Sequence, residues 1–183
     1  MKQIAAAIDA VNDLTGRVIC WGILLMVILQ FAVVIARYVF STSTLFGIPA
    51  VWFQEGVVYL HGMTILLGTA YAMLWNKNVR VDILYDKASP RVQDLTEFFG
   101  SLLFVLPLCL VIGWSALPNV VGAWAVKEGS LEPNGIPFRY VLKALSLVFC
   151  VLVSAQALST MIKAFLRLTG RSSDPIYEVS DEL

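Results

Sequence analysis

The sequence has little charge. Asp, Glu, Lys and Arg make up 14% of its 183 residues, against about 25% in a typical soluble domain. There are 13 basic and 13 acidic residues, so the net charge is zero, and no general attraction to nucleic acid is expected. Hydrophobic residues make up 58% of the chain. This composition predicts an integral membrane protein rather than a soluble domain.

Cysteine and histidine are also scarce. The three cysteines, Cys20, Cys109 and Cys150, lie inside apolar runs without metal-ligand spacing, so we interpret them as small buried hydrophobes and expect no disulfide framework. His61 is the only histidine, whereas a bis-histidine haem needs two axial ligands. No nucleophile motif and no cluster of His, Cys and carboxylates is present. We therefore predict no enzyme, no cofactor and no metal site.

Four long apolar runs dominate what remains. They predict spans at about 18–40, 52–75, 98–124 and 141–166, since about 20 helical residues cross the hydrocarbon core of a bilayer. Trp52 and Trp75 bracket the second run, as aromatic residues do at both membrane interfaces. The fold class predicted is an all-α integral membrane protein, with four transmembrane helices in a single domain over residues 1–170.

Amphipathic segments flank these spans. Ile4, Ile8 and Val11 recur at helical spacing and predict a short interfacial helix over residues 1–17; the alternative is a solvated tail. The pair Ser89-Pro90 predicts a helix start that continues into the third span. Residues 127–139, with two glycines and two prolines, predict an ordered loop. Residues 171–183 are expected to be a disordered cytoplasmic tail.

The basic residues predict the orientation. Nine of them lie in the N-terminal segment, residues 76–97 and the C-terminal tail, namely Lys2, Arg17, Lys77, Arg80, Lys87, Arg91, Lys163, Arg167 and Arg171. Four lie on the opposite side, namely Arg37, Lys127, Arg139 and Lys143. The positive-inside rule then places both termini in the cytoplasm.

Several residues are candidates for a functional role. Arg37 and Glu55 lie at matching depth in the first two spans, which predicts a structural ion pair; the alternative is a site for a coupling ion or proton. We assign a subunit interface to the small-residue stripe Thr64, Gly68 and Ala72. Asp82, directly after the span, is added to it, with helix-end capping as the alternative.

The order of several short motifs resembles one family, the small membrane (Q) subunit of tripartite ATP-independent periplasmic (TRAP) transporters, over about residues 15–168. The residues that carry this resemblance are Arg37-Tyr38 with Phe40, Trp52 with Glu55, Gly68 with Ala70, Val79-x-Val81-Asp82, and Ser89-Pro90-Arg91. The chain departs from the family pattern at Gln54, where a second acid is common, and at Asn78, where a histidine is common.

The resemblance implies a complex of three proteins with separate roles. A periplasmic substrate-binding protein captures an organic acid, and a large membrane subunit carries it inward, driven by a sodium gradient. The small subunit braces the large one within the bacterial inner membrane and its lipid. We assign docking of the binding protein to Glu128, Glu132 and Arg139 in and after the loop before the fourth span.

Two alternatives to this function remain open. The first is a self-sufficient, homo-oligomeric, ion-coupled transporter that uses Glu55. The second is a membrane anchor for a redox enzyme, against which the single histidine argues.

Overall fold

Four long helices form the molecule. The computed structural model describes residues 2–45, 47–78, 88–171 and 176–177. Helix α1 spans Lys2–Tyr38, α2 spans Ala50–Leu74, and α6 spans Arg139–Leu168. The third long helix comprises α4 (Pro90–Gly100), a π-helical turn η1 (Ser101–Val105) and α5 (Leu106–Ala125). Two short strands, β1 (Thr44–Leu45) and β2 (Ile48–Pro49), pair antiparallel between α1 and α2.

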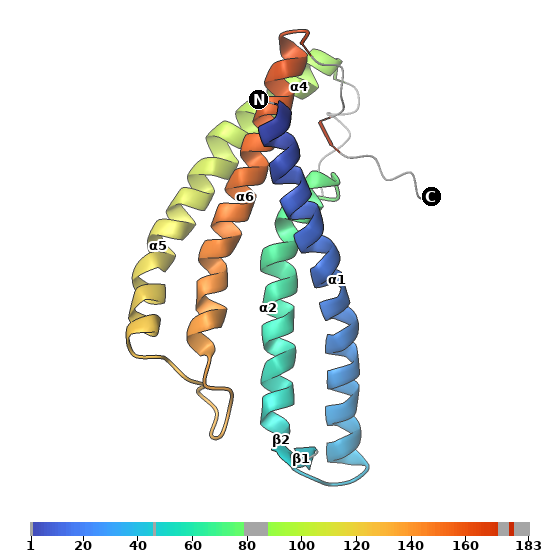
Figure 1. The fold of residues 1–183 in the computed structure, drawn as a ribbon, viewed down its shortest axis with the longest axis vertical. Coiled ribbons are helices and arrows are strands. Elements are labelled where there is room, and N and C mark those ends of the chain that lie inside the picture. Colours follow the sequence, from blue (N-terminus) through green and yellow to red (C-terminus); the bar gives the residue numbers. More distant parts are fainter. Residues whose placement is uncertain (1, 46, 79–87, 172–175, 178–183) are drawn as a thin grey trace.

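The helices lie side by side, and each long helix runs antiparallel to the one that precedes it in the chain, so α2 and α6 are parallel neighbours. Across Figure 1 they follow one another as α5, α6, α2 and α1, and α6 contacts all the other helices. The N-terminus and the end of α6 lie at one end of the bundle, here called the termini end. The β1–β2 hairpin and the α5–α6 loop (residues 126–138) lie at the other, the loop end.

Each of these helices is long and apolar enough to cross a membrane, among the residues that the structure describes. The bundle exposes its large apolar side chains, such as Trp21 and Trp114, and buries small ones, such as Ala70 and Ala157. This arrangement suits a lipid environment, where close packing rather than apolar burial joins helices. The predicted fold class, an all-α membrane protein with four spanning helices, is confirmed. Cys109 and Cys150 are buried as expected, but Cys20 is exposed.

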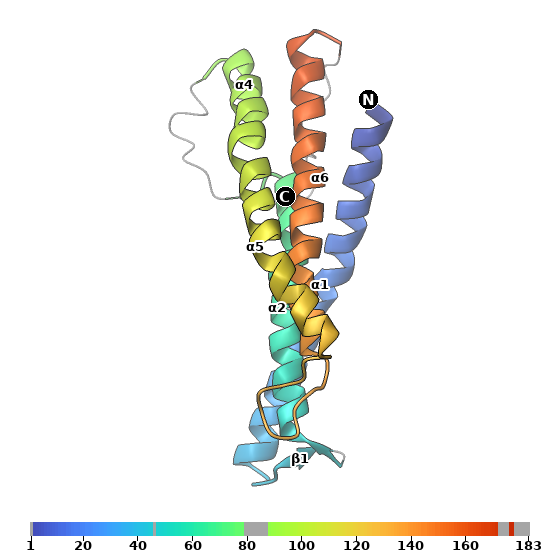
Figure 2. The ribbon, with the colours of Figure 1, turned by 90° about the vertical axis from the view of Figure 1, so that its left-hand side faces the viewer.

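The first helix differs from the prediction. Residues 2–17 and the first span form one continuous helix of 37 residues, about 55 Å long and well beyond the hydrocarbon thickness. Its apolar residues Ile4 and Val11 face outward, whereas Asp9 and Asn12 are buried. Figure 2 shows the start of α1 and helix α4 on either side of α6 at the termini end. Three helices therefore lie together at the termini end.

The third long helix begins as predicted, with Ser89 at its N-cap and Pro90 in its first turn. Pro107 and Pro118 lie further along this helix, where proline removes a backbone hydrogen bond. Pro107 has no N–H to donate to the carbonyl of Leu103, four residues earlier. The π-helical turn η1 lies at this point and ends two residues before Pro107. Pro118 stays inside α5.

Candidate functional site

The α5–α6 loop is fastened to α2 by one carboxylate. Glu55 accepts hydrogen bonds from the Ser130 hydroxyl with one oxygen and from the Ile136 backbone N–H with the other. Trp52, three residues earlier on the same face of α2, donates its indole N–H to the Asn134 carbonyl over 2.7 Å. The predicted ordered loop is thus held against the start of the second span.

A glycine makes this close approach possible. A Cβ at Gly135 would overlap the side chains of both Ser130 and Glu55, so any larger residue pushes the loop away from α2. Asn134, just before it, adopts a positive φ of 60°, a conformation that asparagine tolerates better than most residues. The sequence NG therefore forms the turn that brings the loop onto the carboxylate.

A second acid ties the same loop to α6. Glu128 forms an ion pair with Lys143 at 2.5 Å and lies 3.7 Å from the Nε of Arg139. Its side chain and those of its partners are about one-third exposed or less. Two of the three residues assigned to binding-protein docking, Glu128 and Arg139, therefore contact one another within the chain.

The tip of the loop is left open. Leu131 is 81% exposed, and Glu132 and Phe138 are exposed as well. The backbone of Glu132 is fixed by an N–H bond to the Ser130 hydroxyl and by a carbonyl bond from Gly135. The loop thus presents an acidic and apolar surface on a fixed backbone.

Arg37 does not form the expected ion pair with Glu55 within the described residues. Its guanidinium donates to the side-chain oxygen of Gln54 over 2.9 Å. Adjacent residues of a helix point about 100° apart, so Gln54 and Glu55 bond to different partners, Arg37 at the end of α1 and the α5–α6 loop. Arg37 and Glu55 therefore have different partners: Arg37 bonds to Gln54, and Glu55 bonds to the α5–α6 loop.

The small-residue stripe is divided between two faces. The Thr64 hydroxyl lies 3.8 Å from where a Cβ on Gly22 would stand, so Thr64 faces α1. Gly68, by contrast, has open space at its Cβ position, and Ala72 is half-buried. Asp82 lies outside the described residues. Contact of these residues with another subunit stays a prediction.

A buried polar cluster joins α1 to α6 at the termini end. The Asp9 carboxylate pairs with Lys163 at 2.7 Å and accepts hydrogen bonds from Ser159 and Gln156 at 2.8 and 3.1 Å. Gln156 in turn accepts from the Asn12 amide over 2.7 Å. Sequence analysis missed this cluster. The sequence features that could have indicated it are the polar residues Gln156 and Ser159 in the apolar fourth span, and the acids Asp9 and Asp13, one helical turn apart, before the first span.

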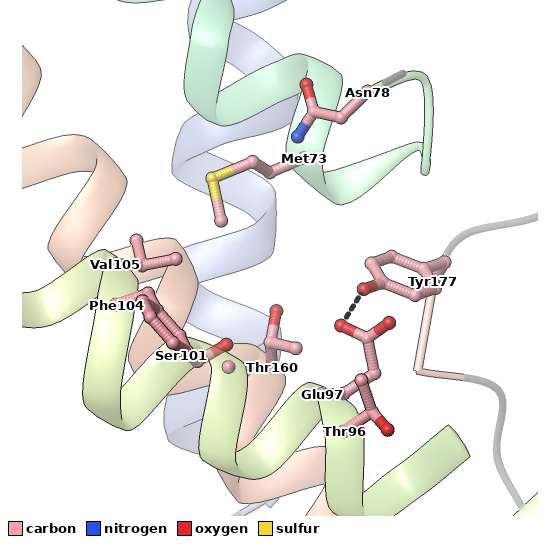
Figure 3. A pocket seen from close by; sticks show the side chains of 10 residues that line it. Met73, Asn78, Thr96, Glu97, Ser101, Phe104, Val105, Thr160 and Tyr177 are labelled. Carbon is pink, nitrogen blue, oxygen red and sulfur yellow. Dashed lines mark hydrogen bonds between the residues drawn. The ribbon is translucent and has the colours of Figure 1, made fainter. Parts of the chain in front are cut away.

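A cavity of about 380 Å³ lies beside this cluster. Figure 3 shows Met73 of α2 and Ser101 and Phe104 of η1 lining it. At its edge the Tyr177 hydroxyl donates to the Glu97 carboxylate, so the C-terminal segment contacts α4. Nearby, Arg167 pairs with Asp94 at 3.1 Å. Residues 171–183 were predicted to be a disordered tail, and within them Ile176 and Tyr177 contact the helices.

The main features of the structure are the α5–α6 loop held against α2 and the polar contact between α1 and α6. Within the described residues there is no group of three or more His, Cys, Asp or Glu side chains able to hold a metal ion. What the arrangement offers is a multi-pass membrane scaffold with a fixed loop at one end and a polar helix contact at the other.

Comparison with known proteins identifies the family. Residues 26–167 match the family model described as the DctQ component of tripartite ATP-independent periplasmic transporters. Searches of curated proteins and of solved structures gave no significant match. The matched region contains all of α2, α4, α5 and the α5–α6 loop, and it confirms the resemblance drawn from the sequence. The chain belongs to the DctQ-component family, the small membrane component of TRAP transporters.

Proposed function

We propose that this membrane component braces the large transport subunit of its complex and helps a periplasmic substrate-binding protein to dock, in sodium-driven uptake of an organic acid. The observation that carries the proposal is the α5–α6 loop, fastened to α2 through both oxygens of Glu55. A docking surface on a membrane protein must keep its shape while the partner comes and goes, and a loop fixed at both sides does so.

The orientation supports this role. Among the residues that the structure describes, the termini end carries seven basic residues and the loop end four. The positive-inside rule then puts the termini in the cytoplasm and the α5–α6 loop in the periplasm of a bacterial inner membrane. Leu131 and Glu132 then face the compartment in which a soluble binding protein operates.

The use of Glu55 weighs against the alternative of a self-sufficient transporter. A coupling carboxylate has to bind and release an ion or proton during each cycle. Both oxygens of Glu55 instead accept hydrogen bonds from the loop, so the carboxylate already has protein partners on both sides. Its position at the start of α2 also places it near the interface rather than at mid-depth.

Co-purification from native membranes tests the bracing role. The tagged chain, extracted in mild detergent, should bring down one large polytopic protein in about equal amount, identified by mass spectrometry. Recovery of the chain alone or as a homo-oligomer would overturn the proposal. Uptake by proteoliposomes holding this chain alone would do the same and favour the alternative.

A charge reversal tests the docking role. Glu132→Lys should weaken binding of the periplasmic protein to the reconstituted complex by about fivefold, because a rim charge acts on association through steering. The matched control is Lys77→Glu, an exposed residue at the termini end, which should leave that affinity unchanged. Equal affinities for Glu132→Lys and the parent would remove Glu132 from the docking surface.

A further inference from the structure

A polar side chain faces outward at mid-depth of α2. His61 lies at about the middle of Ala50–Leu74, it is exposed, and it makes no hydrogen bond within the described residues. Histidines inside membrane spans almost always face a protein interior or water, since an imidazole in lipid leaves its N–H and its lone pair unsatisfied. Something other than lipid tails is therefore expected against this ring.

The residues around His61 form a regular seam. Val58, His61, Ile65, Gly68 and Ala72, here called the His61 face, follow one another at alternating spacings of three and four residues. This is the spacing by which one helix packs along another in a left-handed pair. Val58 and Ile65 are 57% and 54% exposed, and the Cβ position of Gly68 is open.

The neighbouring sides of α2 are already occupied. Leu60 and Thr64 lie against Gly22 of α1, and a Cβ on Gly62 would lie 3.0 Å from Leu142 of α6. The His61 face points between these two contacts, so within the described residues no helix of this chain covers it.

A groove continues the His61 face onto α1. It has a volume of about 440 Å³ and is lined by Met26, Val27, Gln30, Phe31 and Val34 of α1, with Val57 of α2. Val57 lies one turn from His61 on α2 and thus beside it. Gln30 is a second exposed polar side chain within a span, and it too makes no hydrogen bond in the described part of the chain. Two neighbouring helices thus present one outward polar group each, Gln30 in the groove and His61 one turn from the groove residue Val57.

We propose that the His61 face and the Gln30 groove bind one transmembrane helix of the large transport subunit, which offers hydrogen-bonding groups to His61 and Gln30. The proposal rests on the bracing role given above. The partner helix has an apolar surface that fills the groove, a small residue opposite Gly68 for close approach, and a hydroxyl, amide or free carbonyl at mid-depth. The proposed surface differs from the predicted stripe in leaving out Thr64 and including His61.

Photo-crosslinking in native membranes tests the occupant. Benzoylphenylalanine replaces Phe31 or Ile65 on the proposed surface, and Val111 on the exposed side of α5 serves as control. Crosslinks from Phe31 and Ile65 to the large subunit, several-fold stronger than from Val111, are expected. Crosslinks to a second copy of the chain, or only lipid adducts while the parent still co-purifies with the large subunit, would overturn the surface and leave the bracing role intact. A parent that recovers no large subunit would overturn both.

Removal of the polar groups tests their part in binding. His61→Leu and Gln30→Leu should each lower recovery of the large subunit about fivefold, with the chain itself present at its normal level. His61→Asn, which keeps donor and acceptor groups, should recover most of the loss. The control is Ser115→Leu, an exposed polar residue of α5. Full recovery with both leucine variants would show that the surface does not use these groups.

Discussion

The Asp9 carboxylate of α1 and the Lys163 ammonium of α6 lie 2.7 Å apart, with 9% and 17% of their side chains exposed. Lys163 also donates to the carbonyl of Ile176, which is buried. One buried ion pair therefore joins the first helix, the last helix and a residue beyond it.

Removal of one partner of this pair should destabilise the bundle. Lys163→Met leaves the Asp9 carboxylate buried without its counter-ion, and the free energy of unfolding should fall by about 3 kcal/mol. Thermal unfolding in detergent measures this. Adding Asp9→Asn to the same chain should restore most of the loss, since no charge is then left buried. As control, Arg17→Met breaks the exposed Asp13–Arg17 pair and should change little.

Loss of the Glu55 carboxylate should release the α5–α6 loop. In Glu55→Gln one acceptor oxygen becomes an amide donor, which cannot accept from the Ile136 N–H or the Ser130 hydroxyl as before. Hydrogen exchange at the Ile136 amide should rise about tenfold. Glu132→Gln, at the exposed tip of the same loop, should leave exchange unchanged. Equal protection in the parent and in Glu55→Gln would show that other contacts hold the loop.

Two glycines of the loop should respond differently to alanine. At Gly135 a Cβ overlaps Ser130 and Glu55, whereas at Gly129 its nearest neighbour is the Cα of Pro137 at 3.8 Å, an ordinary contact. Gly135→Ala should therefore loosen the loop as Glu55→Gln does, and Gly129→Ala should not. Proteolysis within residues 126–138 in mild detergent gives the readout. Equal cleavage of the two variants would contradict the close approach at Gly135.

Two glycines of α1 should differ in the same way. A Cβ at Gly16 overlaps the ring of Tyr71, but at Gly22 it meets Leu60 and Thr64 at 3.7 and 3.8 Å. Gly16→Ala should cost about 1–3 kcal/mol through overpacking. Gly22→Ala should be neutral or stabilising by up to about 1 kcal/mol, because alanine favours the helix. Shifts of the thermal midpoint with the same sign would contradict the contact between α1 and α2.

The sequence predicted the helices better than their contacts. Hydropathy placed all four spans, and Ser89-Pro90 placed the start of α4, because both signals are local. The contact of α1 with α6 was not predicted, because the spacing of apolar residues does not show which polar side chain has a partner on another helix. Here Ile4 and Val11 face outward and Asp9 faces α6.

The contacts of Glu55 could not be predicted from local sequence patterns. Matching depth suggested Arg37 as its partner, yet depth does not fix the direction in which a helical side chain points. The actual partners, Ser130 and Ile136, lie 75 and 81 positions later in the chain. Only the folded loop brings them to α2.

These long separations also set an order of assembly. When α1 and α2 leave the ribosome, Glu55 has none of its loop donors, and Asp9 lacks Lys163, Gln156 and Ser159. The donors to Glu55 come just before α6, and those to Asp9 lie within it. The loop thus supplies the donors to Glu55 first, and synthesis of α6 supplies the partners of Asp9 afterwards. A nascent chain that stops before residue 139 already holds Ser130 and Ile136 but lacks Gln156, Ser159 and Lys163, so the buried carboxylate of Asp9 has these partners only after α6 is made.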